Sequence, residues 1–429
     1  MSADYWAFPV ASLGPAVISR IGSKPGDYYE NAYPRSDSLL SDPHRSNCYV
    51  RQQCRVGSRP HFRRLEHKLD AKWSAKWSRG HLKERGRSMQ PLVSILIPAY
   101  NAEKWIRATL ESAIGQEYPN KEIIVVNDGS TDRTMEIAKA FQSRFVKIID
   151  QTNHGAPAAR NRALEYAQGA YIQWLDHDDL LARHKISAQL RDGEFAKSER
   201  LLLSCSFGTF YYRPQKAKFY GGPLCRDLAP IDYFLIKFSG NTYFQTSSWL
   251  VSRKLTDLAG PWWEIRSRDD DGEYFCRVVA AAEAIHFVPE AKCFWRIGNY
   301  GSLHSAWSKS DAAREASFAT TCRCIEHLRK LEDSPRSKAA CVKFLQDRLP
   351  YFYPESQDIV NRMQALAREL GGELLRPPLT WKYKWVQSIC NSRASKQVCM
   401  ACRESKVFAK RNWDRLMYTF PSAVVRHDV

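Results

Sequence analysis

Three apolar runs between Pro91 and Asp179 constrain the fold more than any other part of this 429-residue chain. The segment opens with PLVSILIPAYN, continues through KEIIVVNDGSTD and closes on YIQWLDHDD. Each run has the length and composition of a buried strand, and helical patterns lie between the runs. Buried strands that alternate with helices pair in parallel, so the sequence predicts an α/β fold with a mostly parallel sheet flanked by helices.

The strands of this segment are expected at Leu92–Pro98, Glu122–Val126, Val146–Ile149 and Tyr171–Leu175. Asn101 is a candidate cap for the helix that follows the first strand. In open α/β sheets, ligands bind beyond the carboxyl ends of the strands, so the polar residues there are the candidate site. Further short strands are expected at Leu201–Phe207, Phe210–Tyr220, Ile285–Pro289 and Lys292–Arg296.

Composition divides the chain into three parts. Residues 1–88 are basic and have few apolar residues at periodic positions, so we expect a disordered N-terminal extension, with Met89 a candidate for the true start. Residues 89–305 carry the strand and helix pattern, in two halves at 91–179 and 180–305. Residues 306–429 are predicted to form a helical, basic C-terminal region.

A cluster of carboxylates follows the fourth predicted strand. Asp176, Asp178 and Asp179 lie so close in sequence that they repel one another unless a cation offsets their charge. Oxygen-rich clusters of this kind suit Mg²⁺ or Mn²⁺. The alternative is an acidic turn whose Asp side chains cap a helix, but the buried strand before the cluster favours the metal.

A second acidic cluster, RDDDGE, runs from Arg268 into a helical pattern. Asp270 or Asp271 could act as a general base, but an acidic first turn favoured by the helix dipole explains the spacing equally well. Arg160 follows GAPAA in another predicted helix and could bind phosphate or pair with an Asp, and a surface position is an equal alternative.

The net charge of +18 and the pI near 9.4 would suit a nucleic acid, an anionic membrane surface or phosphorylated ligands. The charge is spread along the chain, which equally fits a basic protein without a polyanionic partner. No nucleic-acid-binding module is recognisable, so no specific nucleic acid is expected.

Targeting signals and metal-binding cysteines are not evident. There is no run of about 18 apolar residues and no signal peptide, so we expect a cytoplasmic protein, with peripheral contact at the inner face of the membrane left open. The 12 Cys are scattered, and Cys399 and Cys402 have no second pair at zinc spacing.

Taken together, these motifs resemble those of family 2 glycosyltransferases of the GT-A fold. The matching segments, between Pro91 and His304, are VSILIPAYN, EIIVVNDGSTD, GAPAARNRAL, WLDHDD and AGPWWEIRSRDDDGEYFCRV. The resemblance implies a Rossmann-like nucleotide-binding sheet, a nucleotide-sugar donor, a divalent cation, and single displacement with inversion at the anomeric carbon. Residues 91–179 would then be the donor half and residues 180–305 the acceptor half.

The resemblance also implies roles for individual residues. Asp271 matches the second acid of the family's Glu-Asp pair, the general base, and Asp270 stands in place of the Glu. Asp176 and Asp178 match the DxD motif for ribose and metal, with Asp179 adjacent. Contacts to the nucleotide sugar are implied for Pro98, Tyr100, Glu103, Asp128, Arg160 and Asp176. In the late FWRIGNYGSLHS segment, Trp295 and Gly298 depart from the family's Tyr and His, which leaves Arg296 without an assigned role.

The predicted function is therefore transfer of a sugar from a nucleotide-sugar donor to a hydroxyl of a carbohydrate or lipid-linked acceptor, in polysaccharide or cell-envelope glycan synthesis. The chain shows neither the QxxRW motif nor the membrane helices of processive synthases, so addition of one or a few sugars is expected. The alternative is a catalytically inactive GT-A domain that serves as a nucleotide-sugar-binding scaffold.

Overall fold

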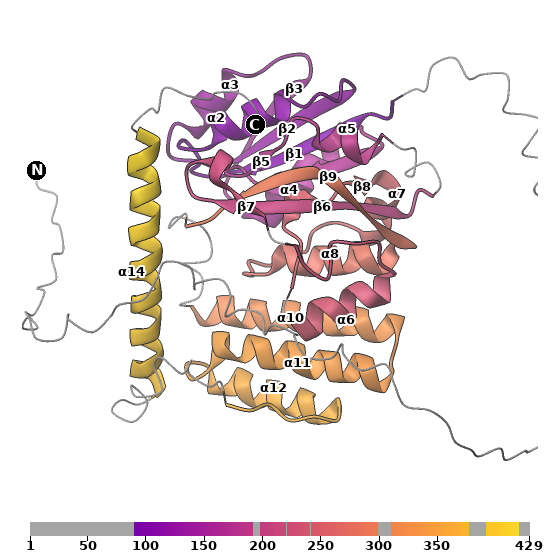
Figure 1. Ribbon diagram of the computed structural model, residues 1–429, viewed down its shortest axis with the longest axis vertical. Helices are drawn as coiled ribbons and strands as arrows, with labels where there is room; N and C mark the ends of the chain where they lie inside the picture. Colours follow the sequence, from indigo (N-terminus) through magenta and orange to yellow (C-terminus); the bar gives the residue numbers. More distant parts are fainter. Residues whose placement is uncertain are drawn as a thin grey trace, which may run out of the picture. The chain divides into compact units, whose positions relative to one another are not determined.

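The computed structural model describes residues 90–191, 198–219, 221–240, 242–298, 310–376 and 392–419. The expected N-terminal extension, Met89 and His304 lie outside these ranges. Within them, two sheets and a group of helices account for the fold (Figure 1).

The first sheet contains the strands predicted from the apolar runs. Its order is β3-β2-β1-β4-β8, and only β8 is antiparallel to its neighbour. The bounds are β1 Val93–Ala99, β2 Lys121–Asp128, β3 Val146–Gln151, β4 Tyr171–Trp174 and β8 Val251–Ser252. Pro98 lies inside β1, and the pairing of β1 with β4 ends two residues earlier, at Leu96. The missing N–H of Pro98 therefore interrupts no hydrogen bond between β1 and β4.

Helices cover both faces of this sheet. The helices that follow the parallel strands are α2 Ile106–Ile114, α3 Thr134–Lys139 and α4 Ala156–Tyr166. Ile95 and Ile97 of β1 share a core with Leu110 of α2, whereas Leu96 shares the other core with Ala163 of α4. The strand alternates in this way because successive side chains of a strand point to opposite faces. The predicted α/β fold with a mostly parallel sheet is confirmed.

The second sheet differs from the sequence prediction in detail. Its order is β5-β9-β6-β7, with β6 and β9 parallel and the outer pairs antiparallel. The bounds are β5 Leu180–Leu181, β6 Leu201–Phe210, β7 Lys218–Phe219 and β9 Ala284–Arg296. The two strands predicted at the end of this region form the single strand β9. The register shifts opposite Cys205 and Ser206, which leaves Pro289, with no N–H to donate, outside the ladder.

The strand predicted at Phe210–Tyr220 is wrong for most of its length, because β6 ends at Phe210 and a short 3₁₀ turn, η5 Pro214–Lys216, precedes β7. Asn101 is also not the cap of α2, which begins five residues later. Its Oδ1 instead accepts a hydrogen bond from the backbone N–H of Thr131 at 2.8 Å, so it joins the loops after β1 and β2. A φ of 47° at Asn101 is a left-handed conformation that Asn tolerates well.

The remaining helices pack beside the sheets or against one another. Their bounds are α5 Lys185–Gln189, α6 Pro230–Gly240, η6 Thr246–Ser248, α7 Arg253–Ala259, α8 Asp270–Ala281, α10 Asp311–Leu331, α11 Pro335–Phe352, α12 Gln357–Glu369 and α14 Ser392–Thr419. Figure 1 shows α10, α11 and α12 stacked beyond α8. The rings of Phe238 on α6 and Phe344 on α11 stack with centroids 3.9 Å apart, so these C-terminal helices extend the core.

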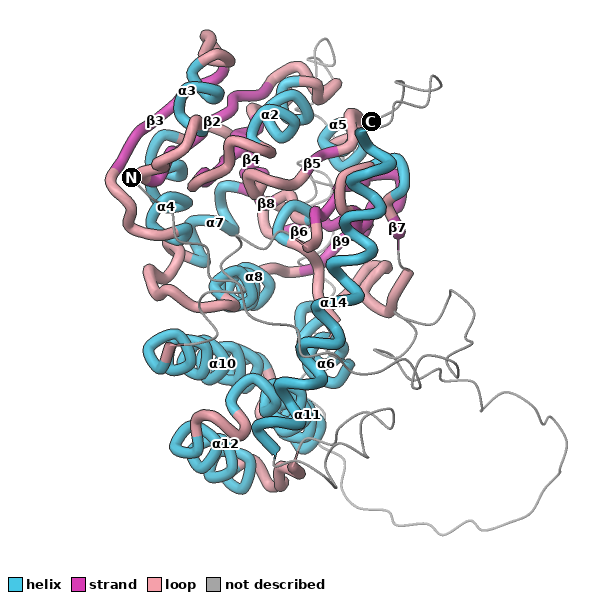
Figure 2. The backbone as a smooth tube through the Cα atoms, turned by 90° about the vertical axis from the view of Figure 1, so that its left-hand side faces the viewer, coloured by secondary structure: helices cyan, strands magenta, loops and turns pink. Residues whose placement is uncertain are grey.

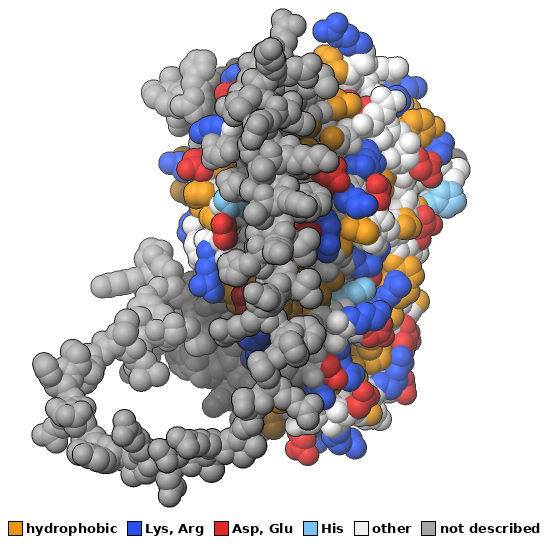
Figure 3. All heavy atoms as spheres, turned by 90° about the vertical axis from the view of Figure 1, so that its right-hand side faces the viewer, with side chains coloured by type: hydrophobic (Ala, Val, Ile, Leu, Met, Phe, Trp, Pro, Cys, Tyr) orange, Lys and Arg blue, Asp and Glu red, His pale blue; other side chains and the backbone are white. Residues whose placement is uncertain are grey.

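The helices within the described ranges include none with both the length and the apolar character needed to cross a membrane. On the coloured part of the face in Figure 3, basic and acidic side chains are interspersed and do not separate into patches of one sign.

Candidate active site

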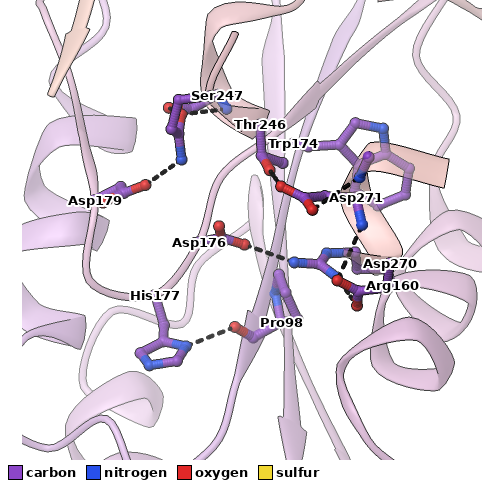
Figure 4. Close-up of polar contacts among 12 residues, drawn as sticks. Pro98, Arg160, Trp174, Asp176, His177, Asp179, Thr246, Ser247, Asp270 and Asp271 are labelled. Atoms are coloured by element: carbon purple, nitrogen blue, oxygen red, sulfur yellow. Dashed lines mark hydrogen bonds and ion pairs between the residues drawn. The ribbon is translucent and has the colours of Figure 1, made fainter. Parts of the chain in front are cut away.

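Arg160 on α4 joins the two acidic clusters. Its guanidinium donates from Nη2 to Oδ1 of Asp176 at 2.9 Å and from Nη1 to Oδ2 of Asp270 at 3.0 Å (Figure 4). The group lies 4.3 Å from the ring of Trp262, and the residue is only 6% exposed. The predicted donor half and acceptor half therefore meet at one buried cation, which holds the loop after β4 beside the first turn of α8.

Two carboxyls at the start of α8 have raised pKa values. Burial raises the pKa of Asp270 to about 6, because desolvation outweighs the opposing charge of Arg160. Burial also raises the pKa of Asp271, and the negative charge of Asp269 adds to the effect. Oδ2 of Asp271 accepts a hydrogen bond from Oγ1 of Thr246 at 3.2 Å, which orients it. A carboxylate with a raised pKa is a better proton acceptor near neutral pH.

The second acidic cluster forms the first turn of a helix, as one of its two interpretations expected. Asp270, Asp271 and Glu273 lie in the first turn of α8, where the helix dipole favours negative charge. Oδ1 of Asp271 accepts a hydrogen bond from the backbone N–H of Gly272 at 2.8 Å. Asp269, at the N-cap, pairs with Arg348 of α11 at 2.5 Å. The start of α8 is thus built from acids that are partly buried.

Two of the three carboxylates predicted to bind a metal, Asp176 and Asp179, point to different places. Asp179 is buried, and its carboxylate accepts hydrogen bonds from Nε2 of Gln245 and from the backbone N–H of Arg296, the latter at 2.8 Å. Burial raises the pKa of Asp179 well above its ordinary value. In Figure 4, Asp176 faces Arg160 while Asp179 is directed toward the segment that holds Ser247. In the described ranges, no group of three or more His, Cys, Asp or Glu side chains is arranged to hold a metal.

Arg296 at the end of β9 is a site residue that sequence reasoning did not identify. Its Nε donates to the backbone carbonyl of Asp178 and its Nη1 to that of Tyr211, both at 2.8 Å. Its guanidinium lies 4.1 Å from the ring of Trp105. Arg296 therefore holds the acidic loop at Asp178, as Arg160 holds it at Asp176. The sequence feature that could have identified Arg296 is the basic residue at the end of the predicted strand Lys292–Arg296.

Four of the residues predicted to contact the nucleotide sugar lie at or just beyond the ends of β1 and β2: Pro98, Tyr100, Glu103 and Asp128. Tyr100 is 45% exposed, so its ring is accessible. The Pro98 carbonyl lies 3.3 Å from Nδ1 of His177. The backbone N–H of Glu103 donates to Oδ2 of Asp132 at 3.0 Å, and its carboxylate accepts from the N–H of Arg133 at 3.3 Å, so it braces the two loops.

Asp128 has a defined structural task. Its carboxylate accepts hydrogen bonds from the backbone N–H groups of His154 at 2.9 Å and Gly155 at 2.8 Å, and from Nε2 of Gln151 at 2.7 Å. These contacts hold the loop that leads into α4 and so position Arg160. Two carboxylate oxygens offer about four acceptor sites, which leaves room for one more donor.

Parts of the chain are similar to known proteins. A model of the family described as "Glycosyl transferase family 2" matches residues 94–242. A putative teichuronic acid biosynthesis glycosyltransferase, TuaG of Bacillus subtilis, is 35% identical over 157 residues, which are 36% of this chain and 56% of that protein. A UDP-Glc:alpha-D-GlcNAc-diphosphoundecaprenol beta-1,3-glucosyltransferase, WfaP of Escherichia coli, is 46% identical over 116 residues, or 27% of this chain and 45% of that protein. The chain thus matches about half the length of these relatives.

Solved structures with some likeness include S. aureus TarS 1-349 in complex with UDP-GlcNAc, at 18% identity and a TM-score of 0.45, covering 67% of this chain and 94% of that one. The mannosyltransferase PcManGT from Pyrobaculum calidifontis, in complex with GDP-Man and Mn2+, has 18% identity and a TM-score of 0.42. The match covers 76% of this chain and 88% of that chain. The family match includes Tyr100, Asp128, Arg160 and the acidic loop, and ends before α8. Over residues 94–242, this chain is similar to glycosyl transferase family 2.

Proposed function

We propose that this protein is an inverting, metal-dependent glycosyltransferase that moves a sugar from a nucleotide-sugar donor to a hydroxyl of a carbohydrate or lipid-linked acceptor. The observation that carries the proposal is the Arg160 bridge between Asp176 and Asp270. It brings a cation suited to a diphosphate next to the carboxyls of α8, where a proton acceptor is needed.

In the proposed mechanism Asp271 removes the proton of the acceptor hydroxyl as that oxygen attacks the anomeric carbon. Thr246 keeps the accepting oxygen in place. Negative charge grows on the leaving diphosphate, and Arg160 lies where it can stabilise that charge. The Nε of Arg160 is buried without a hydrogen-bond partner among the described residues, so the guanidinium keeps donor capacity beyond its two carboxylates.

The family resemblance implies a divalent cation, Mn²⁺ or Mg²⁺, which would neutralise charge on the diphosphate. Asp176 and Asp178 fit this ion, since both offer hard oxygen ligands and neither is fully buried. Asp179 fits less well, because its two oxygens are already engaged by Gln245 and Arg296. We therefore assign Asp179 a supporting role beneath the loop. Donor oxygens and water would complete the coordination.

The nucleotide is proposed to lie over the ends of β1 and β2, with its base near Tyr100 and Asp128. The names of the relatives favour a cell-envelope glycan as product: one is named for teichuronic acid biosynthesis, and the other for a UDP-Glc donor and a diphosphoundecaprenol acceptor. A lipid-linked acceptor would place the enzyme at the inner face of the membrane as a peripheral protein.

A thermal-shift screen over UDP, GDP and dTDP sugars with Mn²⁺, followed by single-turnover assays with the donor that binds, tests the proposal. Asp271→Asn should slow transfer or donor hydrolysis by about 10²- to 10⁴-fold while leaving donor affinity unchanged. Asp257→Asn, an exposed acid on α7, is the control and should be neutral. Tight nucleotide binding with no turnover of any donor would instead identify a scaffold, and an effect of Asp271→Asn on affinity alone would place the base elsewhere.

A further inference from the structure

Helix α14 is fastened to the rest of the protein by one face. The carboxylate of Asp414 accepts hydrogen bonds from the backbone N–H of Tyr212 at 2.9 Å and from Nε of Arg213 at 2.7 Å, and the two charged side chains are 13% and 19% exposed. Nη1 of Arg411 donates to the carbonyl of Gly298 at 2.8 Å. These charge-assisted bonds hold the helix beside the strand ends of β6 and β9 (Figure 2).

The opposite face of α14 is apolar and exposed. Val398, Phe408, Trp413 and Leu416 are 40%, 53%, 64% and 48% exposed. With 3.6 residues per turn, these four side chains fall within an arc of about 140° whose centre lies nearly opposite Asp414 and Arg411. We call these four residues the apolar stripe. Large side chains gathered on one helix face in this way mark an interaction surface.

Basic side chains flank the apolar stripe. Lys406, Lys410 and Arg415 are exposed on α14. The sequence of the helix contains seven Lys or Arg against two Asp or Glu, and one of the two acids, Asp414, is engaged by Arg213. A basic amphipathic helix with Trp and Phe on its apolar face, too polar to cross a bilayer, is typical of helices that lie in the membrane interface.

We propose that α14 binds the surface of an anionic lipid bilayer, with the apolar stripe at the boundary between headgroups and acyl chains and the flanking cations on lipid phosphates. This inference specifies which part of the chain makes the peripheral membrane contact of the proposed function. It rests on the proposed function only for the choice of a membrane as the anionic surface. A second copy of the chain is a poorer occupant, because two such helices would set Lys410 and Arg415 against like charges.

The same helix would orient the active site relative to the lipid. Asp414 holds the segment that follows β6, and in that segment the carbonyl of Tyr211 accepts a hydrogen bond from Arg296. Arg296 in turn holds the acidic loop at Asp178. A rigid path of hydrogen bonds therefore links the proposed membrane-facing helix to the donor site.

Co-sedimentation of the full chain with vesicles tests the inference. Binding is expected to vesicles of mixed phosphatidylcholine and phosphatidylglycerol, and to weaken with salt. Leu416→Ser combined with Trp413→Ser should lower the partition coefficient by about tenfold or more, because both side chains leave the acyl boundary. Leu258→Ser, on α7 at 51% exposure, is the matched control and should have no effect.

The basic side chains that flank the apolar stripe are tested separately. Arg415→Glu should weaken binding to the mixed vesicles by about fivefold or more, whereas Arg144→Glu, an exposed arginine outside α14, should not. Failure of the wild-type chain to bind, or equal binding by the stripe variant, would overturn the inference. The inference would also be overturned if the wild-type chain formed a dimer and did not bind vesicles, and the stripe variant dissociated that dimer. The assay has no catalytic readout, so its result is independent of whether sugar transfer is found.

Discussion

Replacing Arg160 by Met should reveal how strongly the active site depends on one buried cation. The substitution keeps most of the side-chain volume against Trp262 but removes the charge shared by Asp176 and Asp270. Removing one partner of a buried ion pair typically costs 3 to 5 kcal/mol, and we expect a loss of about that size in the free energy of unfolding at pH 8.

The loss should depend on pH in a defined direction. The pKa of Asp270 is about 6 in the folded protein and 3.8 ordinarily, a difference that corresponds to about 3 kcal/mol of destabilisation once the pH exceeds both values. Arg160 opposes this effect, so its removal raises the pKa of Asp270 further. At pH 5 the Asp270 carboxyl is largely protonated with or without Arg160, and the cost of Arg160→Met should be smaller there by about 1 to 2 kcal/mol.

Urea unfolding followed by tryptophan fluorescence at pH 5 and pH 8 measures both quantities. Arg162→Met is the matched control: it lies two residues further along α4, and its ion pair with Glu165 has side chains 43% and 60% exposed, so the loss should be about 1 kcal/mol or less. Arg160→Lys should recover only part of the stability, because the compact ammonium of Lys binds two carboxylates less well than the planar guanidinium of Arg. Equal losses at the two pH values, or a loss no larger than that of Arg162→Met, would refute the reasoning.

Two further predictions concern the metal and the C-terminal helix. Asp178→Ala should abolish metal-dependent transfer without lowering the unfolding midpoint by more than a few degrees; transfer that persists at the same Mn²⁺ concentration would remove Asp178 from the metal site. Asp414→Ala should release α14 from Arg213 and speed amide hydrogen exchange across residues 392–419 by about tenfold or more, as expected when a charged hydrogen bond of about 1.5 to 3 kcal/mol is lost. Asp358→Ala, which removes an exposed pair with Arg362, is its control, and equal exchange in the two variants would contradict the docking role of Asp414.

The parallel part of the first sheet could be predicted from sequence because β1 and β2, at its centre, are buried and show as runs rich in Val, Ile and Leu. The second sheet could be predicted only roughly. Its long strands carry a register shift, and β7 is two exposed residues, so neither alternation nor apolar length marks their ends. Edge strands and bulges depend on the partner strand, which the local sequence does not contain.

The candidate site, like the two sheets, could be predicted only in part. The sequence allowed Arg160 a phosphate, an Asp or the surface, and only the fold shows that two carboxylates from distant segments meet it. Asp179 was grouped with Asp176 by proximity in sequence, but the backbone turns between them, with the N–H of Asp179 donating to the carbonyl of Asp176 at 3.1 Å, so the side chains diverge. Arg296 was missed because its hydrogen-bond partners are backbone carbonyls, which carry no residue signature.

The parallel pairing of β6 with β9 has a consequence for the order of folding. Leu201 pairs with Ala284 and Phe210 with Arg296, so the ladder closes a loop of more than 80 residues that includes α6, α7 and α8. Contacts of such sequence separation form late, after the local helices and the consecutive strands β1 to β4. During synthesis the acidic loop therefore leaves the ribosome long before Arg296 arrives to hold it. The proposed nucleotide-binding edge can therefore assemble before β9 is added, whereas the contact of Arg296 with the acidic loop requires that last strand.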